Sequence, residues 1–265
     1  MAGSNINVLD IGHGEAVMLG HSYLWGADMW QPQIEALSKH YRVIVPELWG
    51  HGRSGALPAG TADMADLARQ HLALMDALGI ARCAVIGLSV GGMWGAEMAL
   101  IAPDRVSALA LVATSLAAEP EASHAQYFAM LDIVEAAASL PEGVRNAIVP
   151  LFFSPEAPAR HPDLIARFEQ SLHDWPSESL VNSVVPLGRI IFGRRDALAD
   201  LPRIDCPRLV VTGEGDRARP PIEGARMAER LDAPFITIAG AGHIASLEAP
   251  GAVTDVLERF LAEAI

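Results

Sequence analysis

Short, continuously apolar runs recur along the 265-residue chain, and helical patterns separate them. A strand that is apolar at every position is buried on both faces, as in a parallel sheet with helices above and below it. Between the runs, apolar residues recur at intervals of three and four, which is the spacing of an amphipathic helix. This alternation predicts an α/β fold made of repeated βαβ units, with strands at INVLDI, AVMLG, YRVIVPE, CAVIGLS, ALALVAT, RLVVTGE and FITIAG.

One region departs from this alternation. From about Ser115 to Ala197 the helical patterns continue without a clear strand, and closely spaced prolines interrupt them. A separate domain of that size would need its own core, and so many prolines favour several short helices that pack on the sheet. We therefore expect one structural domain, with an α/β core at residues 1–114 and 198–265 and a helical lid inserted at residues 115–197.

A glycine-flanked serine stands at the end of one predicted strand, in the stretch Gly87-Leu88-Ser89-Val90-Gly91. A serine nucleophile on a tight strand-to-helix turn needs glycines two positions away on each side, because the backbone folds past itself there. The helix that follows directs its N-terminal N–H groups at the place where an oxyanion would form. The simpler interpretation is an ordinary glycine-rich turn, but the strand before and the helix after favour Ser89 as a nucleophile.

A serine hydroxyl is a weak nucleophile at neutral pH and needs a base, for which nine histidines compete. His243 is the best placed, because it follows the last predicted strand in FITIAGAGHIASLEAP, where two glycines mark a turn. His51, in LWGHGRSG, also follows a strand, but we expect it to shape a loop. Most of the others stand in polar or helical contexts that are typical of surface residues.

An acid that orients the histidine should follow a strand between the serine and the base. The stretch RLVVTGEGDRARPP supplies one, because Asp216 lies just past the strand and gives the chain order Ser89, Asp216, His243. Glu214 stands two residues earlier and is the alternative acid.

The reaction also needs hydrogen-bond donors for the oxyanion and a pocket for the acyl group. The first turn of the helix after Ser89 offers the main-chain N–H of Val90, and the loop in AVMLGHSYLWGADMW suggests that of Tyr23 as the second donor. Large apolar residues beside this loop and in the lid are candidates for the substrate pocket, although core packing is the competing interpretation for the tryptophan of the loop. These candidates are Trp25, Phe128, Phe152 and Trp175.

With these residues in place, the chain resembles the α/β-hydrolase superfamily over nearly its full length. The likeness is specific at separated points: GHSYLWGADMW is similar to the family's oxyanion loop, GLSVGG to its nucleophile elbow, RLVVTGEGD to its acid loop and GAGHIASLEAP to its histidine loop. The stretch LALMDALGIARCAVIGLSVGG most resembles 3-oxoadipate enol-lactonases and the related small esterases and lactonases.

Some positions depart from the family pattern. Ser22 stands where the family usually has glycine, which resembles the Asn-Ser variant of enol-lactonases, and Glu47 stands where aspartate is usual. The short N-terminus implies a sheet of about seven strands. Haloalkane dehalogenases and epoxide hydrolases resemble this fold but carry aspartate as the nucleophile, so Ser89 excludes their mechanism.

Bulk composition narrows the class of partner. The formal net charge of -13 argues against nucleic acid, because phosphate binding needs clustered lysine and arginine. No segment reaches the roughly 18 apolar residues of a membrane span, and the N-terminus lacks a signal pattern, so we expect a cytoplasmic protein away from membranes.

Cys83 and Cys206 lack metal-ligand spacing and are expected to be reduced core thiols. We expect neither a metal nor a cofactor.

The sequence thus predicts an enzyme that cleaves a carboxylic ester or lactone (EC 3.1.1) of small size through an acyl-enzyme, with self-association left open. Hydrolytic C–C cleavage and cofactor-free perhydrolysis use the same triad and are the alternatives. From another class, some relatives keep the triad but act as ligand receptors. Sustained turnover of p-nitrophenyl acetate would favour the enzyme, whereas slow or single-turnover hydrolysis with a large ligand-induced stability change would favour the receptor.

Overall fold

A seven-stranded sheet forms the centre of the computed structural model, which describes residues 5–265. The strands lie in the order β1-β3-β2-β4-β5-β6-β7, and only the edge pair β1 and β3 is antiparallel. The prediction of about seven mostly parallel strands is confirmed. Their bounds are β1 Val8–Ile11, β2 Ala16–Gly20, β3 Arg42–Pro46, β4 Cys83–Leu88, β5 Val106–Val112, β6 Arg208–Gly213 and β7 Phe235–Ile238.

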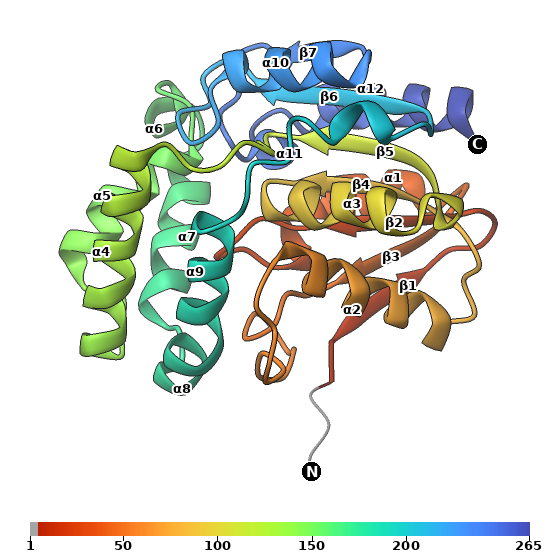
Figure 1. Cartoon of the computed structure of the whole chain (residues 1–265). Helices are drawn as coiled ribbons and strands as arrows, with labels where there is room; N and C mark the ends of the chain where they lie inside the picture. Colours follow the sequence, from red (N-terminus) through yellow and green to blue (C-terminus); the bar gives the residue numbers. More distant parts are fainter. Residues whose placement is uncertain (1–4) are drawn as a thin grey trace.

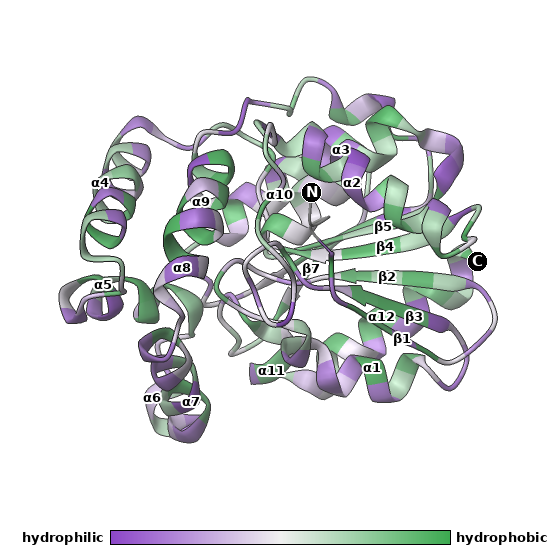
Figure 2. Cartoon of the chain, turned by 90° about the horizontal axis from the view of Figure 1, so that it is seen from below, coloured by the Kyte–Doolittle hydropathy of each residue, from purple (hydrophilic) through white to green (hydrophobic). Residues whose placement is uncertain are grey.

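Helices cover both faces of this sheet (Figure 1). Helices α2 and α3 pack together on one face, and α1, α11 and α12 pack together on the other (Figure 2). Nowhere in residues 5–265 is a helix long and apolar enough to cross a membrane. The bounds are α1 Gln31–Leu37, α2 Met64–Ala77, α3 Val90–Ile101, α10 Pro221–Leu231, α11 Ala245–Glu248 and α12 Pro250–Ala264, with short 3-10 turns η1 Ala27–Trp30, η2 Pro103–Arg105 and η4 Leu201–Arg203.

Burial is complete only in the middle of the sheet. Every residue of β2 and β4 is buried, whereas β1 and β7, at the two edges, are largely exposed or half-buried. Leu9 and Ile11 of β1 are among the exposed large apolar residues. Continuous apolar sequence therefore predicted the strands, but burial on both faces holds only for strands with a neighbour on each side.

A group of helices between β5 and β6 lies together beside the sheet (Figure 1). No strand interrupts this stretch in the described chain. Its division from the core at residues 115–197 stays a prediction, and residues 1–4 of the predicted core lie outside the described residues. The helices are α4 Glu121–Ala137, α5 Glu142–Phe152, α6 Ala157–Arg160, α7 Pro162–His173, α8 Ser177–Ser179, the π-helical segment η3 Leu180–Val184 and α9 Val185–Phe192.

Both cysteines are free thiols. Cys83 is buried in β4, and burial raises its pKa to about 12, so that it stays protonated at neutral pH. Cys206 is only half-buried, although the sequence indicated a core position. Neither thiol has the lowered pKa of a reactive cysteine.

Candidate active site

Ser89 occupies a strained turn between β4 and α3, with φ 57° and ψ -120°. The chain crosses itself closely there, because a Cβ atom on Gly87 would lie 2.2 Å from the main chain of Gly91. A Cβ atom on Gly91 would in turn lie 2.3 Å from the carbonyl oxygen of Gly20 in β2. The Ser89 N–H donates to the carbonyl of Val112 at 2.9 Å, which ties the turn to β5. Only glycine fits two positions before and two positions after this serine.

His243 and Asp216 form a buried pair beside this turn. The imidazole Nδ1 of His243 lies 2.9 Å from Oδ2 of Asp216, and both side chains are almost fully buried. The other carboxylate oxygen, Oδ1, accepts the main-chain N–H groups of Ala218 and Arg219 at 2.9 and 2.8 Å. A carboxylate can only accept, so Nδ1 carries the proton and Nε2 of the neutral ring is left as a proton acceptor. Glu214 is exposed and accepts a main-chain N–H of the histidine loop instead.

The loop after β6 and the loop after β7 are packed against each other. A Cβ atom on Gly213 would lie 2.1 Å from the carbonyl oxygen of Gly242. Buried Glu248, at the end of α11, accepts the N–H of Gly242 at 2.9 Å and that of Ser154 at 3.0 Å. This carboxylate therefore joins the histidine loop to the helical insertion. The sequence did not identify it, because its only signal is an acidic residue in an apolar stretch.

Two main-chain N–H groups near Ser89 are free to bind an anion. The structure records no acceptor within residues 5–265 for the N–H of Val90, in the first turn of α3, or for that of Tyr23, in the loop after β2. The side-chain hydroxyl of Tyr23 donates to the carbonyl of Val184 in the π-helical segment at 2.7 Å. Buried Ser22 has a hydroxyl without a partner in the same range.

Two buried histidines hold the loop that contains Tyr23. Nε2 of His21 accepts the N–H of Leu48 at 2.8 Å, and Nε2 of His51 accepts the N–H of Leu24 at 3.1 Å. Burial lowers the pKa of both, to about 3 for His51, so both rings are neutral at pH 7. His51 thus shapes the loop, which is the role expected from the sequence.

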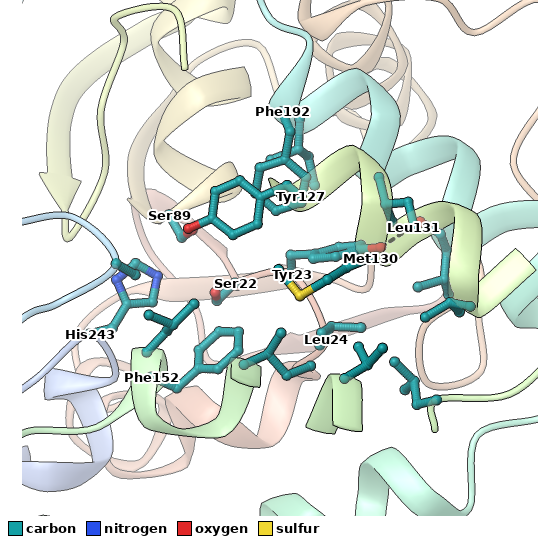
Figure 3. A pocket seen from close by; sticks show the side chains of 18 of the residues that line it. Ser22, Tyr23, Leu24, Ser89, Tyr127, Met130, Leu131, Phe152, Phe192 and His243 are labelled. Carbon is teal, nitrogen blue, oxygen red and sulfur yellow. Dashed lines mark hydrogen bonds between the residues drawn. The ribbon is translucent and has the colours of Figure 1, made fainter. Parts of the chain in front are cut away.

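A pocket between the core and the insertion opens onto Ser89 and His243. Figure 3 shows Ser89, Ser22 and His243 gathered at one end, while Met130 and Leu131 lie toward the other. Most of its wall is apolar side chains from the loop after β2, from α4, α5 and α9, and from η3. Within the described chain no hydrogen bond joins the side chains of Ser89 and His243. Such a bond often forms well only with substrate present.

The predicted substrate-binding residues separate into two groups. Phe152 lines the pocket and contacts the ring of His243 at 5.7 Å between centroids. Trp25 instead stacks on Phe168 of α7 at 4.4 Å, which fastens the insertion to the loop after β2. Trp175 donates its indole N–H to a loop carbonyl after β3 at 3.3 Å. The structure does not bring Trp25, Phe128 or Trp175 into the wall of this pocket.

Helical geometry explains the position of Phe128. The residues of α4 that line the pocket are Tyr127, Met130, Leu131 and Val134, which recur every three to four positions and so share one face of the helix. Phe128 follows Tyr127 directly and is turned by about 100° from it. This spacing was the available signal, and it identifies the face of α4 better than side-chain size does.

Comparison with known proteins identifies the family of this chain. The model of the alpha/beta hydrolase fold family matches residues 15–250, so the chain belongs to the α/β-hydrolase family. A protein of Variovorax paradoxus (strain S110) that carries the name carbamate hydrolase RutD is 32% identical over 94% of this chain and 92% of its own. Among solved structures, a thermophilic esterase from Thermogutta terrifontis superposes with a TM-score of 0.88 at 28% identity, covering 98% of this chain and 93% of its own. The enol-lactonase from Burkholderia xenovorans gives 0.86 at 28% identity and covers 98% of each chain.

Proposed function

We propose that this α/β hydrolase cleaves carboxylic esters or lactones through an acyl-enzyme on Ser89, with His243 as base and Asp216 as the acid that orients it. The observation that carries the proposal is the buried His243–Asp216 hydrogen bond of 2.9 Å beside a serine on a strained strand-to-helix turn. The esterase and enol-lactonase to which the chain is similar support the same class of bond.

In the acylation step, Nε2 of His243 takes the proton of the Ser89 hydroxyl while the oxygen attacks the carbonyl carbon. Asp216 holds the imidazole in the required tautomer and stabilises the imidazolium that forms. The N–H groups of Tyr23 and Val90, for which the structure records no acceptor within residues 5–265, bind the oxyanion. The imidazolium then gives its proton to the leaving alcohol, and the acyl group stays on Ser89.

Deacylation repeats these steps with water. His243 removes a proton from the water, which attacks the acyl carbon, and Ser89 leaves as the group protonated by the imidazolium. In a lactone the leaving alcohol remains part of the acyl chain, so the product is a single hydroxy acid. The same residues therefore serve an ester and a lactone alike.

The helical insertion acts as the lid of this site. Helices α4, α5 and α9 supply most of the apolar wall, so the lid determines which acyl groups fit. Phe152 is the sequence candidate with the strongest support for substrate contact, because it both lines the pocket and touches His243.

Hydrolysis of a panel of p-nitrophenyl esters and small lactones, beside Ser89→Ala, tests the proposal. We expect sustained turnover that depends on Ser89. Single-turnover release followed by a large rise in melting temperature would favour the ligand-receptor alternative. Hydrolysis of a β-diketone without any ester hydrolysis would favour C–C cleavage instead. Peroxide-dependent oxidation without any ester hydrolysis would favour perhydrolysis.

A further inference from the structure

The pocket that contains Ser89 has one permanently charged residue in its wall. Among the described residues that line it, only Arg219 carries a cationic side chain besides the titratable His243, and none is acidic. Arg219 follows Asp216 in the acid loop and is itself buried. An anionic acyl group would therefore depend on Arg219 for its countercharge.

Arg219 is already occupied by a buried carboxylate. Its two terminal nitrogens lie 2.6 and 3.2 Å from the two oxygens of Glu119, a two-point pairing of guanidinium and carboxylate. Arg194, just after α9, donates to the same carboxylate at 2.8 Å. Burial disfavours the charge of Glu119, but the hydrogen bonds and charges of Arg219 and Arg194 outweigh it and lower its pKa. Glu119 is thus ionised at neutral pH.

The charges of this cluster balance. Glu223, at the start of α10, lies 3.6 Å from Arg219 and is the second carboxylate beside the two arginines. Two positive and two negative groups leave no net charge to attract a substrate carboxylate. Water hardly reaches Glu119 in this pairing, because only 2% of its side chain is exposed. A carboxylate that enters the pocket would lose its hydration without gaining an uncompensated positive charge.

We propose that the site selects esters or lactones with a neutral, apolar acyl group, and that Glu119 sets this selectivity by occupying Arg219. The inference rests on the proposed hydrolase function and extends it to a substrate class. It separates this chain from a hydrolase whose substrate carries a free carboxylate on the acyl side. Glu119 is a specificity-determining residue that acts through Arg219 and takes no part in bond cleavage.

Three matched p-nitrophenyl esters test the selectivity of the unmodified protein. These are the hexanoate, the monoester of adipic acid and the same adipate with its far carboxyl group methylated. The second differs from the first by a terminal carboxylate on a six-carbon acyl chain, and the third removes the charge while keeping the added bulk. We expect kcat/KM for the free-acid ester to be at least about a hundredfold below both neutral esters, because a desolvated charge without a partner is strongly penalised.

Glu119→Gln tests the assignment to this residue. The change removes the carboxylate charge that pairs with Arg219 and leaves one net positive charge. The ratio of kcat/KM for the free-acid ester to that for the hexanoate should therefore rise at least about tenfold. Asp132→Asn is the matched control, because it removes an exposed lid carboxylate that pairs with Arg189, and we expect it to leave this ratio unchanged. A ratio corrects for any general loss of activity.

A second variant guards against poor folding of the first. In Glu119→Gln with Arg194→Met only one buried arginine remains to be accommodated. The two-point carboxylate pairing of Arg219 is lost but Glu223, 3.6 Å away, still balances its charge, so the ratio should rise by less than in the single variant. The inference is overturned if the unmodified protein accepts the free-acid ester within tenfold of the hexanoate, or if neither variant changes the ratio. If none of the three esters shows hydrolysis that depends on Ser89, the proposed function fails as well, and the two failures are thereby distinguished.

Discussion

Replacing Asp216 by asparagine would reverse the direction of one hydrogen bond. Oδ1 of Asp216 accepts two main-chain N–H groups, from Ala218 and Arg219, so an asparagine must keep its carbonyl oxygen on that side. Its NH2 group then faces Nδ1 of His243 from the position of Oδ2, 2.9 Å away. A donor there requires an unprotonated Nδ1, which moves the proton to Nε2, where it prevents the ring from accepting the serine proton.

We expect Asp216→Asn to lower kcat about 10⁴-fold for p-nitrophenyl acetate, which corresponds to about 5.4 kcal/mol of transition-state stabilisation. The fold should persist, because the amide keeps the shape and the two main-chain hydrogen bonds. Steady-state kcat and the melting temperature are the measurements. Glu214→Gln is the matched control, and its kcat should stay within about threefold of the parent since Glu214 is exposed. A variant Asp216→Asn with kcat within tenfold of the parent, or a dead Glu214→Gln, would refute the assignment of the acid.

Three further changes have defined outcomes. Ser89→Ala should lower kcat by at least about three orders of magnitude while remaining folded, and residual hydrolysis within tenfold of the parent would exclude Ser89 as nucleophile. Phe152→Ala should change the kcat/KM ratio between acetate and octanoate esters by roughly tenfold to a hundredfold. Trp175→Ala should instead lower the melting temperature and affect all esters alike. A uniform loss for both variants would show that Phe152 does not select among acyl groups. Burial lowers the pKa of His51 to about 3 in the folded state, below its unfolded value near 6.5. Between these values the unfolded chain binds one more proton than the folded chain, so the free energy of unfolding falls as the pH drops from 6.5 toward 3. Urea unfolding of His51→Gln should show a shallower loss over this range, by up to about 1.4 kcal/mol per pH unit, and an unchanged slope would contradict the buried neutral ring.

Local sequence pattern was sufficient to predict the strands and the turn that holds Ser89. Strands and tight turns depend on neighbouring residues. Glycine is required at positions 87 and 91 because a Cβ atom there would lie only 2.2 and 2.3 Å from other main-chain atoms. The places of Asp216 and His243 could also be predicted, because both follow parallel strands whose carboxyl ends meet at one edge of the sheet. Asp216 and His243 could therefore be assigned to one site although they are far from Ser89 in the sequence.

The side chains that line the pocket could not be predicted as well, because they depend on how each insertion helix is rotated against the core. Large size drew attention to Phe128, whereas the pocket face of α4 is set by Tyr127 and its helical neighbours. The buried carboxylates Glu119 and Glu248 were missed for another reason. In sequence an acidic residue looks the same whether water or a buried partner surrounds it, and only the fold brings the guanidinium groups to Glu119.

The hydrogen bond from the Tyr23 hydroxyl to the carbonyl of Val184 links the side chain of this residue to the helical insertion. In the proposed mechanism its main-chain N–H binds the oxyanion, so one end of Tyr23 would serve the reacting centre while the other holds η3. An outward displacement of η3 and α9 must either break this bond or draw the loop after β2 away from Ser89. In the proposed mechanism, admission of substrate and readiness for the reaction are therefore mechanically coupled, because the donor is held in place only while this bond is intact.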